Sequence, residues 1–296
     1  MKKQAIESKV TISHSEKVWF PQSGITKGDI ISYYREVSEY FIKYSCDHPV
    51  TLQRFPDGIS SNSFFQKNLS NYFPVWIAST KVEKKNGAVE MAMINDVETL
   101  IYLTNQGTIV YHLWLSESSN SHNPDRMIID LDPENENDFE KVRKAAKKIR
   151  SIYEKLDLPC FLMVTGSKGI HMVTPLLGKE SFDEVKGFAK KLCDHLTQQC
   201  PEETTTEIRK ENRRGRVFLD YLRNAYAQTG VAPYSVRAFE NAPVAIPLFC
   251  EELDDKKIHA QYFTIKNVAK RLEKMGDPWE HFYSSKKSIE NLADKL

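Results

Sequence analysis

Apolar residues follow two different periods along this chain, and the two periods predict helices and strands in turn. Spacings of three and four residues predict amphipathic helices at 26–44, 138–156, 181–199 and 264–275, and a short helix near 95–104. Alternating or continuous apolar runs predict strands at 10–21, 50–55, 75–77, 89–93, 108–115, 127–132, 160–164, 171–175 and 217–221, with a hairpin turn at 84–87. We therefore expect an α/β (α+β) protein whose central sheets are flanked by helices.

Two of the predicted helices begin with a capping box. Thr26 is followed by Asp29, and Ser181 is followed by Glu184. In each case the first side chain can accept from a backbone amide of the first turn, while the acid accepts from the cap residue. These pairs fix where we expect the two helices to start.

Composition narrows the class of protein. The chain has 296 residues, a formal net charge of +1, 41% hydrophobic residues and 27% charged residues, which is ordinary for a globular protein. The low net charge excludes a generally basic coat for nucleic acid but leaves room for local basic patches. With no apolar leader and no apolar run of membrane-spanning length, we expect a cytosolic protein.

The cysteines and the segment boundaries add two further expectations. Five widely spread cysteines without C-x-x-C spacing fit neither a disulfide framework nor a zinc site, and Cys160 and Cys193 lie in apolar patterns that favour the core. Because no repeat, low-complexity stretch or interdomain linker is evident, residues 1–296 are expected to form a single domain.

The first candidate for chemistry is the acidic pair Asp130 and Asp132. On a strand the two side chains project from the same face, while Leu131 points into the opposite layer. Pro133 should end the strand, which leaves both carboxylates at its C-terminal edge. Adjacent carboxylates repel unless a cation lies between them, and an oxygen-coordinated divalent ion is the usual solution. The alternative is a pair of solvated turn acids.

Two further motifs suit a phosphate substrate. The turn 165–171, Thr-Gly-Ser-Lys-Gly-Ile-His, offers two glycines for close backbone approach, and hydroxyl, lysine and histidine donors. It is not a Walker A loop, because it joins two strands and has a different spacing. A later strand ends at Asp220, and Arg237 follows. Three carboxylates at strand ends, a phosphate-binding turn and a downstream arginine favour two-metal nucleotidyl transfer.

For several other residues the sequence allows both a functional and a structural interpretation. Lys17 and Lys27 flank a turn, and the pattern alone favours two solvated lysines. Phe64 and Phe65 precede Lys67, an arrangement that suits base stacking beside a phosphate contact, although both rings could equally lie in the core. His112 lies on a predicted strand, where a single histidine is more often structural than catalytic.

Several motifs resemble one known family. Asp-Leu-Asp-Pro (130–133), Gly-Ser-Lys-Gly-Ile-His (166–171) and Phe-Leu-Asp-Tyr (218–221) resemble the three signature motifs of the archaeo-eukaryotic primase superfamily, and more narrowly the polymerase domain of bacterial ligase D. The resemblance extends, in family order, over roughly residues 10–285, and it includes the segments 24–29, 54–58, 64–67, 234–238, 242–244 and 276–279.

The resemblance implies a fold and a role for each matching residue. The fold would be a primase-like catalytic core with an RRM-like palm and an N-terminal extension of about residues 1–50 for a DNA 5′-phosphate. Catalysis and metal binding would fall to Asp130, Asp132 and Asp220. The incoming nucleotide would be bound by Thr165, Ser167, Lys168, Gly169, His171 and Arg237, with His112 nearby. Lys17 and Lys27 would bind the 5′-phosphate, and the template or DNA backbone would be contacted by Arg54, Phe64, Phe65 and Lys67.

The resemblance also implies an activity. We expect a template-dependent DNA/RNA polymerase of non-homologous end joining that fills gaps and extends or aligns broken, 5′-phosphorylated DNA ends. Two Mn²⁺ or Mg²⁺ ions per site, a preference for ribonucleotides, and a separate DNA ligase and Ku as partners are implied. Since no ligase or nuclease module is evident in this sequence, a stand-alone, nucleoid-associated polymerase is expected. The alternatives are a primase that starts strands de novo and a non-catalytic end-bridging module.

The sequence departs from the family pattern at a few positions. His14 stands where the family leads us to expect asparagine, Tyr111 where an acid is common, and Cys250 where tryptophan is expected. Thr165 replaces a serine but keeps the hydroxyl group. The departures leave the three aspartates intact, so the expected chemistry stands.

Overall fold

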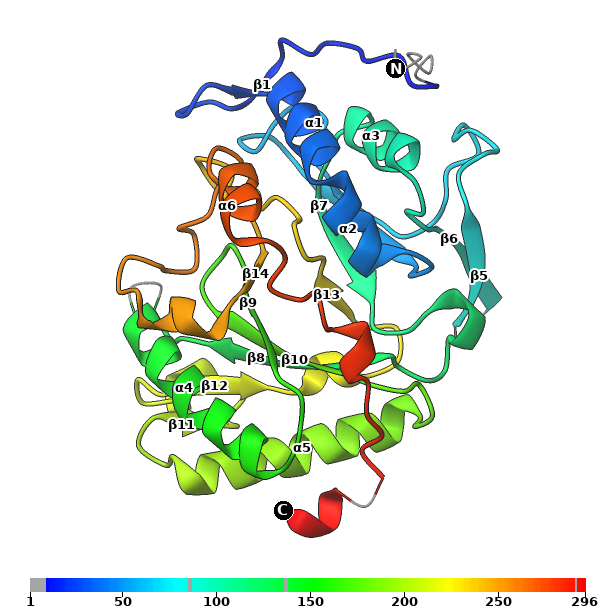
Figure 1. Cartoon of the computed structure of the whole chain (residues 1–296). Helices are drawn as coiled ribbons and strands as arrows, with labels where there is room; N and C mark the ends of the chain where they lie inside the picture. Colours follow the sequence, from blue (N-terminus) through cyan, green and yellow to red (C-terminus); the bar gives the residue numbers. More distant parts are fainter. Residues whose placement is uncertain (1–8, 85–86, 136–137, 291) are drawn as a thin grey trace.

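The candidate acids lie on a six-stranded sheet. The computed structural model describes residues 9–84, 87–135, 138–290 and 292–296 (Figure 1). In the order β11-β12-β8-β10-β9-β14, neighbouring strands run antiparallel except for the parallel pair β11–β12. The strands are β8 (Arg126–Asp132), β9 (Phe161–Val164), β10 (Ile170–Pro175), β11 (Thr204–Thr205), β12 (Val217–Asp220) and β14 (Ile246–Leu248).

Two long helices pack against this sheet. They are α4 (Phe139–Lys155) and α5 (Phe182–Gln199), and both contact β8. In Figure 1 they lie below the sheet. The predicted stripe of α4, which includes Val142, Ala146 and Ile149, is fully buried, so the apolar period of the sequence accounts for the packing of this layer.

A second, four-stranded antiparallel sheet has the order β13-β7-β3-β4. Its strands are β3 (Val50–Arg54), β4 (Phe64–Gln66), β7 (Thr108–Trp114) and β13 (Thr229–Val231). Three helices lie near this sheet in the upper part of Figure 1: α1 (Lys27–Glu36), α2 (Ser38–Ser45) and α3 (Val97–Asn105). One continuous core of buried residues extends from this part of the chain to the six-stranded sheet.

The remaining elements are short. A two-stranded sheet pairs β1 (Val18–Phe20) with β2 (Ile25–Thr26), and a hairpin pairs β5 (Ser79–Lys84) with β6 (Gly87–Ala92). One more helix, α6 (Val268–Met275), follows β14, and single-turn 3₁₀ segments fill several of the connections. In the part of the chain that the structure describes, no helix has the length and apolar character needed to cross a membrane.

The mixed α/β class, both capping boxes and most element positions confirm the sequence predictions. Thr26 and Ser181 each accept from the third backbone amide of their helix, and Asp29 and Glu184 complete the boxes. The hairpin is confirmed by the pairing of Lys84 with Gly87, while the two turn residues between them lie outside the described residues.

Four boundaries were wrong. The helix expected at 26–44 divides at Val37, whose ψ of 7° ends α1 before α2 begins. Residues 75–77 form a turn and not a strand, because the amide of Ile77 donates to the carbonyl of Pro74 at 3.1 Å. Only Val18–Phe20 of the expected strand 10–21 pairs with another strand. The helix expected at 264–275 begins at Val268, since the side chain of Asn267 accepts from the amide of Thr264 in a turn before it.

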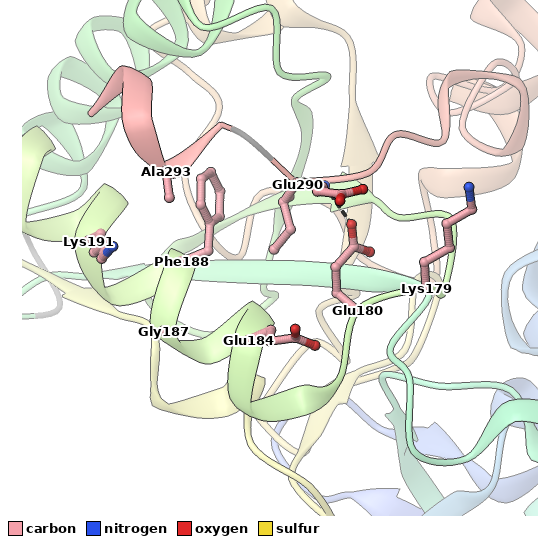
Figure 2. A pocket seen from close by; sticks show the side chains of 9 residues that line it. Lys179, Glu180, Glu184, Gly187, Phe188, Lys191, Glu290 and Ala293 are labelled. Atoms are coloured by element: carbon pink, nitrogen blue, oxygen red, sulfur yellow. Dashed lines mark hydrogen bonds between the residues drawn. The ribbon is translucent and has the colours of Figure 1, made fainter.

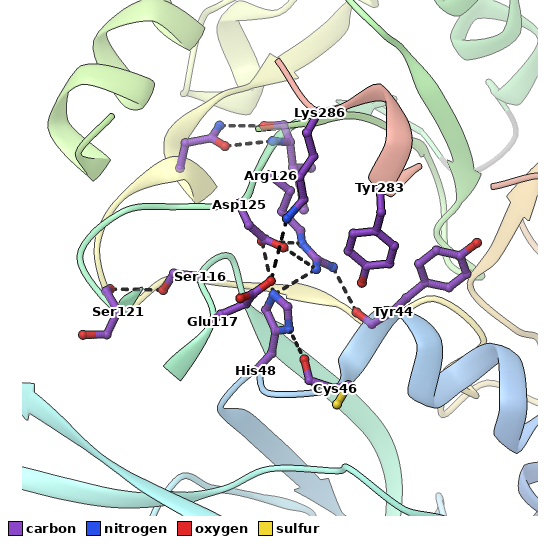
Figure 3. Close-up of polar contacts among 12 residues, drawn as sticks. Tyr44, Cys46, His48, Ser116, Glu117, Ser121, Asp125, Arg126, Tyr283 and Lys286 are labelled. Carbon is purple, nitrogen blue, oxygen red and sulfur yellow. Dashed lines mark hydrogen bonds and ion pairs between the residues drawn. The ribbon is translucent and has the colours of Figure 1, made fainter. Parts of the chain in front are cut away.

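A buried polar network joins the two main sheets (Figure 3). The guanidinium of Arg126, the first residue of β8, donates two bonds to Asp125, of 2.9 and 3.0 Å. Its third nitrogen donates to the carbonyl of Tyr44 on α2. His48, just before β3, lies 3.1 Å from Asp125 and 2.9 Å from Arg126. The network therefore links β8 to the helix and strand that support the other sheet.

The cysteines behave as the sequence predicted. All five are free thiols. Cys193 is fully buried, and Cys160 is partly buried against the same core.

Candidate active site

Strand pairing places the three candidate acids at one edge of the six-stranded sheet. β12 pairs with β8 so that Asp220 lies opposite Asp130 and Phe218 lies opposite Asp132. Leu131, between the two acids of β8, is fully buried in the opposite layer. The side-chain alternation predicted from the sequence therefore holds, and the acid that is remote in sequence joins the other two through strand pairing.

The predicted phosphate-binding turn lies beside these acids. β9 and β10 form the expected strand-turn-strand unit, and His171 on β10 pairs directly with Asp130 on β8. Within the turn, the Thr165 hydroxyl accepts from the amide of Gly169 at 3.2 Å. A Cβ atom on Gly169 would lie only 2.1 Å from the carbonyl oxygen of Leu131. Glycine at this position is what lets the turn approach the strand of the acids so closely.

A single cavity of about 270 Å³ collects the candidate metal-binding and nucleotide-binding residues except Asp220 and Gly169. They come from strands of both main sheets and from the turn. Its lining consists of His112, Asp130, Asp132, Thr165, Ser167, Lys168, His171, Arg223, Val231 and Arg237. Two carboxylates therefore face a group of cationic and hydroxyl side chains across one small space.

The three acids differ in protonation behaviour. Burial acts to raise the pKa of Asp130, but the neighbouring His171 and Arg223 outweigh it and lower the pKa to about 2. Arg223 Nε lies 3.0 Å and His171 Nε2 lies 3.4 Å from the same Asp130 oxygen. Burial and the charge of Asp130 together raise the pKa values of Asp132 and Asp220. Such mutual repulsion is typical of carboxylates that share a cation.

The cavity also contains buried nitrogen atoms without partners. Among the described residues, His112 Nε2 and His171 Nδ1 are buried without a hydrogen bond. Burial, together with Arg237, Arg223 and His171, lowers the pKa of His112 to about 3, so its ring is neutral near pH 7. Burial lowers the pKa of Arg237 to about 10, which leaves it cationic, and it donates to the Thr165 carbonyl at 2.8 Å. Unsatisfied polar atoms beside cationic groups suit an anionic ligand.

The two lysines predicted to bind a 5′-phosphate lie together at the N-terminal end of α1. The backbone amide of Lys27 donates to the carbonyl of Lys17 at 2.8 Å. Lys27 is 5% exposed and donates to the Ser13 carbonyl at 2.6 Å, whereas Lys17 donates to Asp57 at 2.6 Å. Burial and the charge of Lys17 lower the pKa of Lys27. The pair forms a cationic site in which an anion would relieve repulsion.

The aromatic pair lies at the mouth of the site. Phe64 and Phe65 on β4 are both exposed, at 47% and 60%, which argues against the core interpretation. The ring of Phe65 makes an edge contact with His112, with 5.9 Å between centroids. Lys67, directly after the strand, is also exposed. Exposed rings that adjoin the cavity are available for base stacking.

A second hollow, of about 520 Å³, is larger but chemically different (Figure 2). It lies between α5 and the C-terminal segment, and acidic Glu180, Glu184 and Glu290 share it with Lys179 and Lys191. No residue of the candidate site, all of which are described, lines this hollow. The small cavity between the two sheets is therefore the candidate active site.

Comparison with known proteins identifies the family of this chain. The family described as "LigD, primase-polymerase domain" matches residues 26–279. The chain is 32% identical over 279 residues to the bifunctional non-homologous end joining protein LigD of Bacillus subtilis, a match that covers 94% of this chain and 45% of that protein. The chain belongs to the LigD primase-polymerase domain family. This domain is a nucleotidyltransferase.

Two further similarities agree with this family. It is 31% identical over 288 residues to the multifunctional LigD of Pseudomonas aeruginosa, which covers 97% of this chain and 34% of that protein. The chain thus spans about a third to a half of the length of these relatives. The polymerase domain of Mycobacterium tuberculosis ligase D, solved in complex with DNA, superposes with a TM-score of 0.88 at 29% identity and covers 95% of this chain.

LigD polymerase domains are metal-dependent, and the donor set found here fits a divalent ion. In the described residues, no group of three or more histidines, cysteines or acids is already arranged as a metal cage. A polymerase site needs no such cage, because Mg²⁺-type ions are commonly held by one or two carboxylates together with substrate phosphates. The mutually repelling oxygen donors Asp130, Asp132 and Asp220 meet that requirement.

Sequence reasoning missed Arg223 and the internal contacts of Arg54. Arg223 lies three residues after Asp220, but only strand pairing brings it to Asp130, so local pattern gave no signal. Arg54 is 9% exposed and donates within the chain to the Gln106 carbonyl, the Gln66 amide oxygen and the Tyr72 hydroxyl. Its guanidinium also stacks on Phe64 at 5.3 Å. Arg54 therefore supports the aromatic pair from below the surface, and its contact with the DNA backbone stays a prediction.

Proposed function

We propose that this LigD-type domain is a template-dependent polymerase that fills gaps and extends or aligns broken DNA ends in non-homologous end joining. The observation that carries the proposal is the cavity in which Asp130 and Asp132 face His171, Lys168 and Arg237. Acids for metal ions and cations for a triphosphate are the two halves of a nucleotidyl-transfer site.

Each group of the cavity has a role in this proposal. Asp130, Asp132 and Asp220 hold two divalent ions, Mn²⁺ or Mg²⁺, which when bound neutralise charge at the attacking and leaving oxygens. The triphosphate is bound by Thr165, Ser167, Lys168, His171 and Arg237 and by the backbone at Gly169. His112 is neutral near pH 7, so it positions the nucleotide by hydrogen bonding and contributes no charge.

The surfaces outside the cavity bind DNA in this proposal. Lys17 and Lys27, within an N-terminal extension of about 50 residues, bind the 5′-phosphate of the downstream strand. Phe64 and Phe65 stack on template bases, and the exposed Lys67 contacts the backbone. We further propose that residues 1–296 act as a single domain on nucleoid DNA, that ribonucleotides are the preferred substrates, and that Ku and a DNA ligase act on the same ends.

The test is primer extension across a gap of one nucleotide. Ribonucleotides and deoxyribonucleotides are compared with Mn²⁺ and with Mg²⁺, with and without a 5′-phosphate on the downstream strand. We expect extension that is stimulated by the phosphate and is greatest with ribonucleotides. The Asp130→Ala variant should abolish extension but still bind gapped DNA.

Other outcomes have distinct meanings. Synthesis on a single strand without a primer would identify a primase. DNA binding without synthesis by the wild-type protein would identify an end-bridging module. Extension by the Asp130→Ala variant at the wild-type rate would refute the assigned metal site.

A further inference from the structure

The cavity contains a cation that its proposed substrates do not account for. Arg223 Nε donates to Asp130 Oδ2 at 3.0 Å and lies 4.0 Å from Asp220 Oδ2. It therefore lies between two of the three proposed metal ligands. The side chain of Asp130 is only 8% exposed, whereas that of Arg223 is 38% exposed.

The backbone that carries Arg223 is firmly attached to the sheet. Asn224, fully buried, accepts from the amide of Ile128 at 2.8 Å and donates back to the carbonyl of the same residue. The amide of Leu222 donates to Asp220 Oδ1 at 2.8 Å. The turn is thus fixed on both sides of Arg223, so the guanidinium can change partners only by rotation of its partly exposed side chain.

The charges explain why the guanidinium lies where it does. Without a cation, the buried carboxylate of Asp130 would repel Asp132 and Asp220, whose pKa values it raises. Asp130 and Asp220 in turn raise the pKa of Arg223, although burial acts to lower it. With His171, which also lies beside Asp130, Arg223 is therefore a counter-charge that makes three neighbouring acids tolerable in the absence of a divalent ion.

A guanidinium and a divalent ion are both drawn to the negative charge of Asp130, and at its Oδ2 atom the two cations would repel each other. We infer that Arg223 is an internal substitute for the metal: it neutralises Asp130 in the metal-free protein and moves away from this carboxylate when a divalent ion binds. This inference rests on the proposed function, because that function implies the divalent ions at these acids. Arg223 is then a positioning residue that sets the metal affinity of the site.

Release of Arg223 has a second consequence for the cavity. Once freed, the guanidinium remains among the cavity-lining residues, which include Lys168 and Arg237. A bound triphosphate offers it new anionic partners. Triphosphate and metal therefore favour the same position of the side chain, so each ligand should raise the affinity for the other.

The experiment measures Mn²⁺ binding to the full chain by electron paramagnetic resonance of the free ion. We expect Arg223→Gln to lower the Kd for Mn²⁺ by roughly tenfold, since it removes both the competitor and its repulsion of the ion; tenfold corresponds to about 1.4 kcal/mol. Arg223→Lys, which keeps the charge, should remain within about twofold of wild type. Arg35→Gln, which removes an exposed arginine on α1, is the matched control and should change nothing.

Two further readouts separate this role from a merely structural one. In the metal-free state Arg223→Gln should lower the Tm, while added Mn²⁺ should raise its Tm by more than it raises that of wild type. In an Asp130→Asn background, Arg223→Gln should lower the Kd by less than it does in wild type, because competition for the Asp130 carboxylate is gone and only the repulsion of the ion by Arg223 remains.

The failures are distinguishable. If wild type binds Mn²⁺ and Arg223→Gln binds it no more tightly, the inference is wrong and the proposed function stands. If Arg223→Gln weakens binding, Arg223 organises the acids and does not compete for them. If neither protein binds Mn²⁺, with or without a triphosphate, the proposed metal site itself is refuted.

Discussion

At the scale of single residues, some candidate site residues carry charges that the chain does not neutralise fully. Lys27 is a nearly buried ammonium group whose pKa is lowered by burial and by Lys17. Its own partners, the carbonyl and hydroxyl of Ser13, are uncharged. A neighbouring pair of cations of this kind is costly for the empty protein and is stabilised by a bound anion.

The first prediction concerns this pair. Lys17→Ala together with Lys27→Ala should remove the preference for 5′-phosphorylated over unphosphorylated gaps, because the anion then has no cationic site. The ratio of the two extension rates should fall to about one, because the substitutions remove a charge-assisted contact that typically contributes about 1.5–3 kcal/mol. Extension on unphosphorylated gaps should stay unchanged. Lys270→Ala, at an exposed position on α6, serves as the control. A preference that survives the double substitution would reject the assignment.

At the scale of secondary-structure elements, the sequence predicted what is local and missed what is not. Helices α4 and α5 and strand β8 were predictable because long periodic stripes and a terminal proline determine them. The division of the helix expected at 26–44 was not predictable, because the apolar period of the sequence continues through Val37. The contact of Arg223 with Asp130 depends on the register of β12 against β8, which no local pattern records. The buried position of Arg54 likewise depends on its contacts with Gln106 and Tyr72, which are distant in sequence.

The second prediction concerns the approach of two elements. Gly169→Ala would place a Cβ atom 2.1 Å from the carbonyl oxygen of Leu131 on β8, so β10 or the turn must move away from the acids. We expect the free energy of unfolding to fall by about 1–3 kcal/mol, as for overpacking, and triphosphate affinity to fall with it. Urea denaturation and nucleotide titration measure the two effects.

A second glycine provides the control for this prediction. Gly187 lies inside helix α5, and a Cβ atom added there would meet nothing within 4 Å. Gly187→Ala should therefore stabilise the protein by about 0.5–1 kcal/mol through helix propensity alone. Equal destabilisation by both substitutions would show that the close approach at Gly169 has no special role.

At the scale of the whole molecule, the candidate active site is formed by both main sheets. His112 comes from β7 and Val231 from β13 of the four-stranded sheet, whereas Asp130 and His171 come from the six-stranded sheet. The relative position of the sheets therefore decides the geometry of the cavity. The buried network of Asp125, Arg126 and His48 in Figure 3 lies at the other end of β8 and links the same two sheets.

The last prediction tests this link. Asp125→Asn would leave the buried guanidinium of Arg126 without its charge partner, a change that typically costs about 3–5 kcal/mol. Burial acts to raise the pKa of Asp125, but Arg126 and His48 lower it below its usual range. Its stabilising effect is therefore complete above the unfolded pKa of about 3.9 and is lost progressively as the pH falls from there toward the lower folded pKa. Urea denaturation should show a large deficit at pH 7 that persists at pH 5 and begins to shrink only below the unfolded pKa.

The same experiment distinguishes loss of this network from loss of any ion pair. Asp254→Asn removes the exposed partner of Lys147, and exposed pairs contribute little, so its denaturation curve should match that of wild type. If Asp125→Asn also separates the sheets, it should weaken triphosphate binding, although Asp125 lies outside the cavity. A variant that is destabilised but binds the nucleotide with wild-type affinity would show that the network supports β8 without setting the position of one sheet against the other.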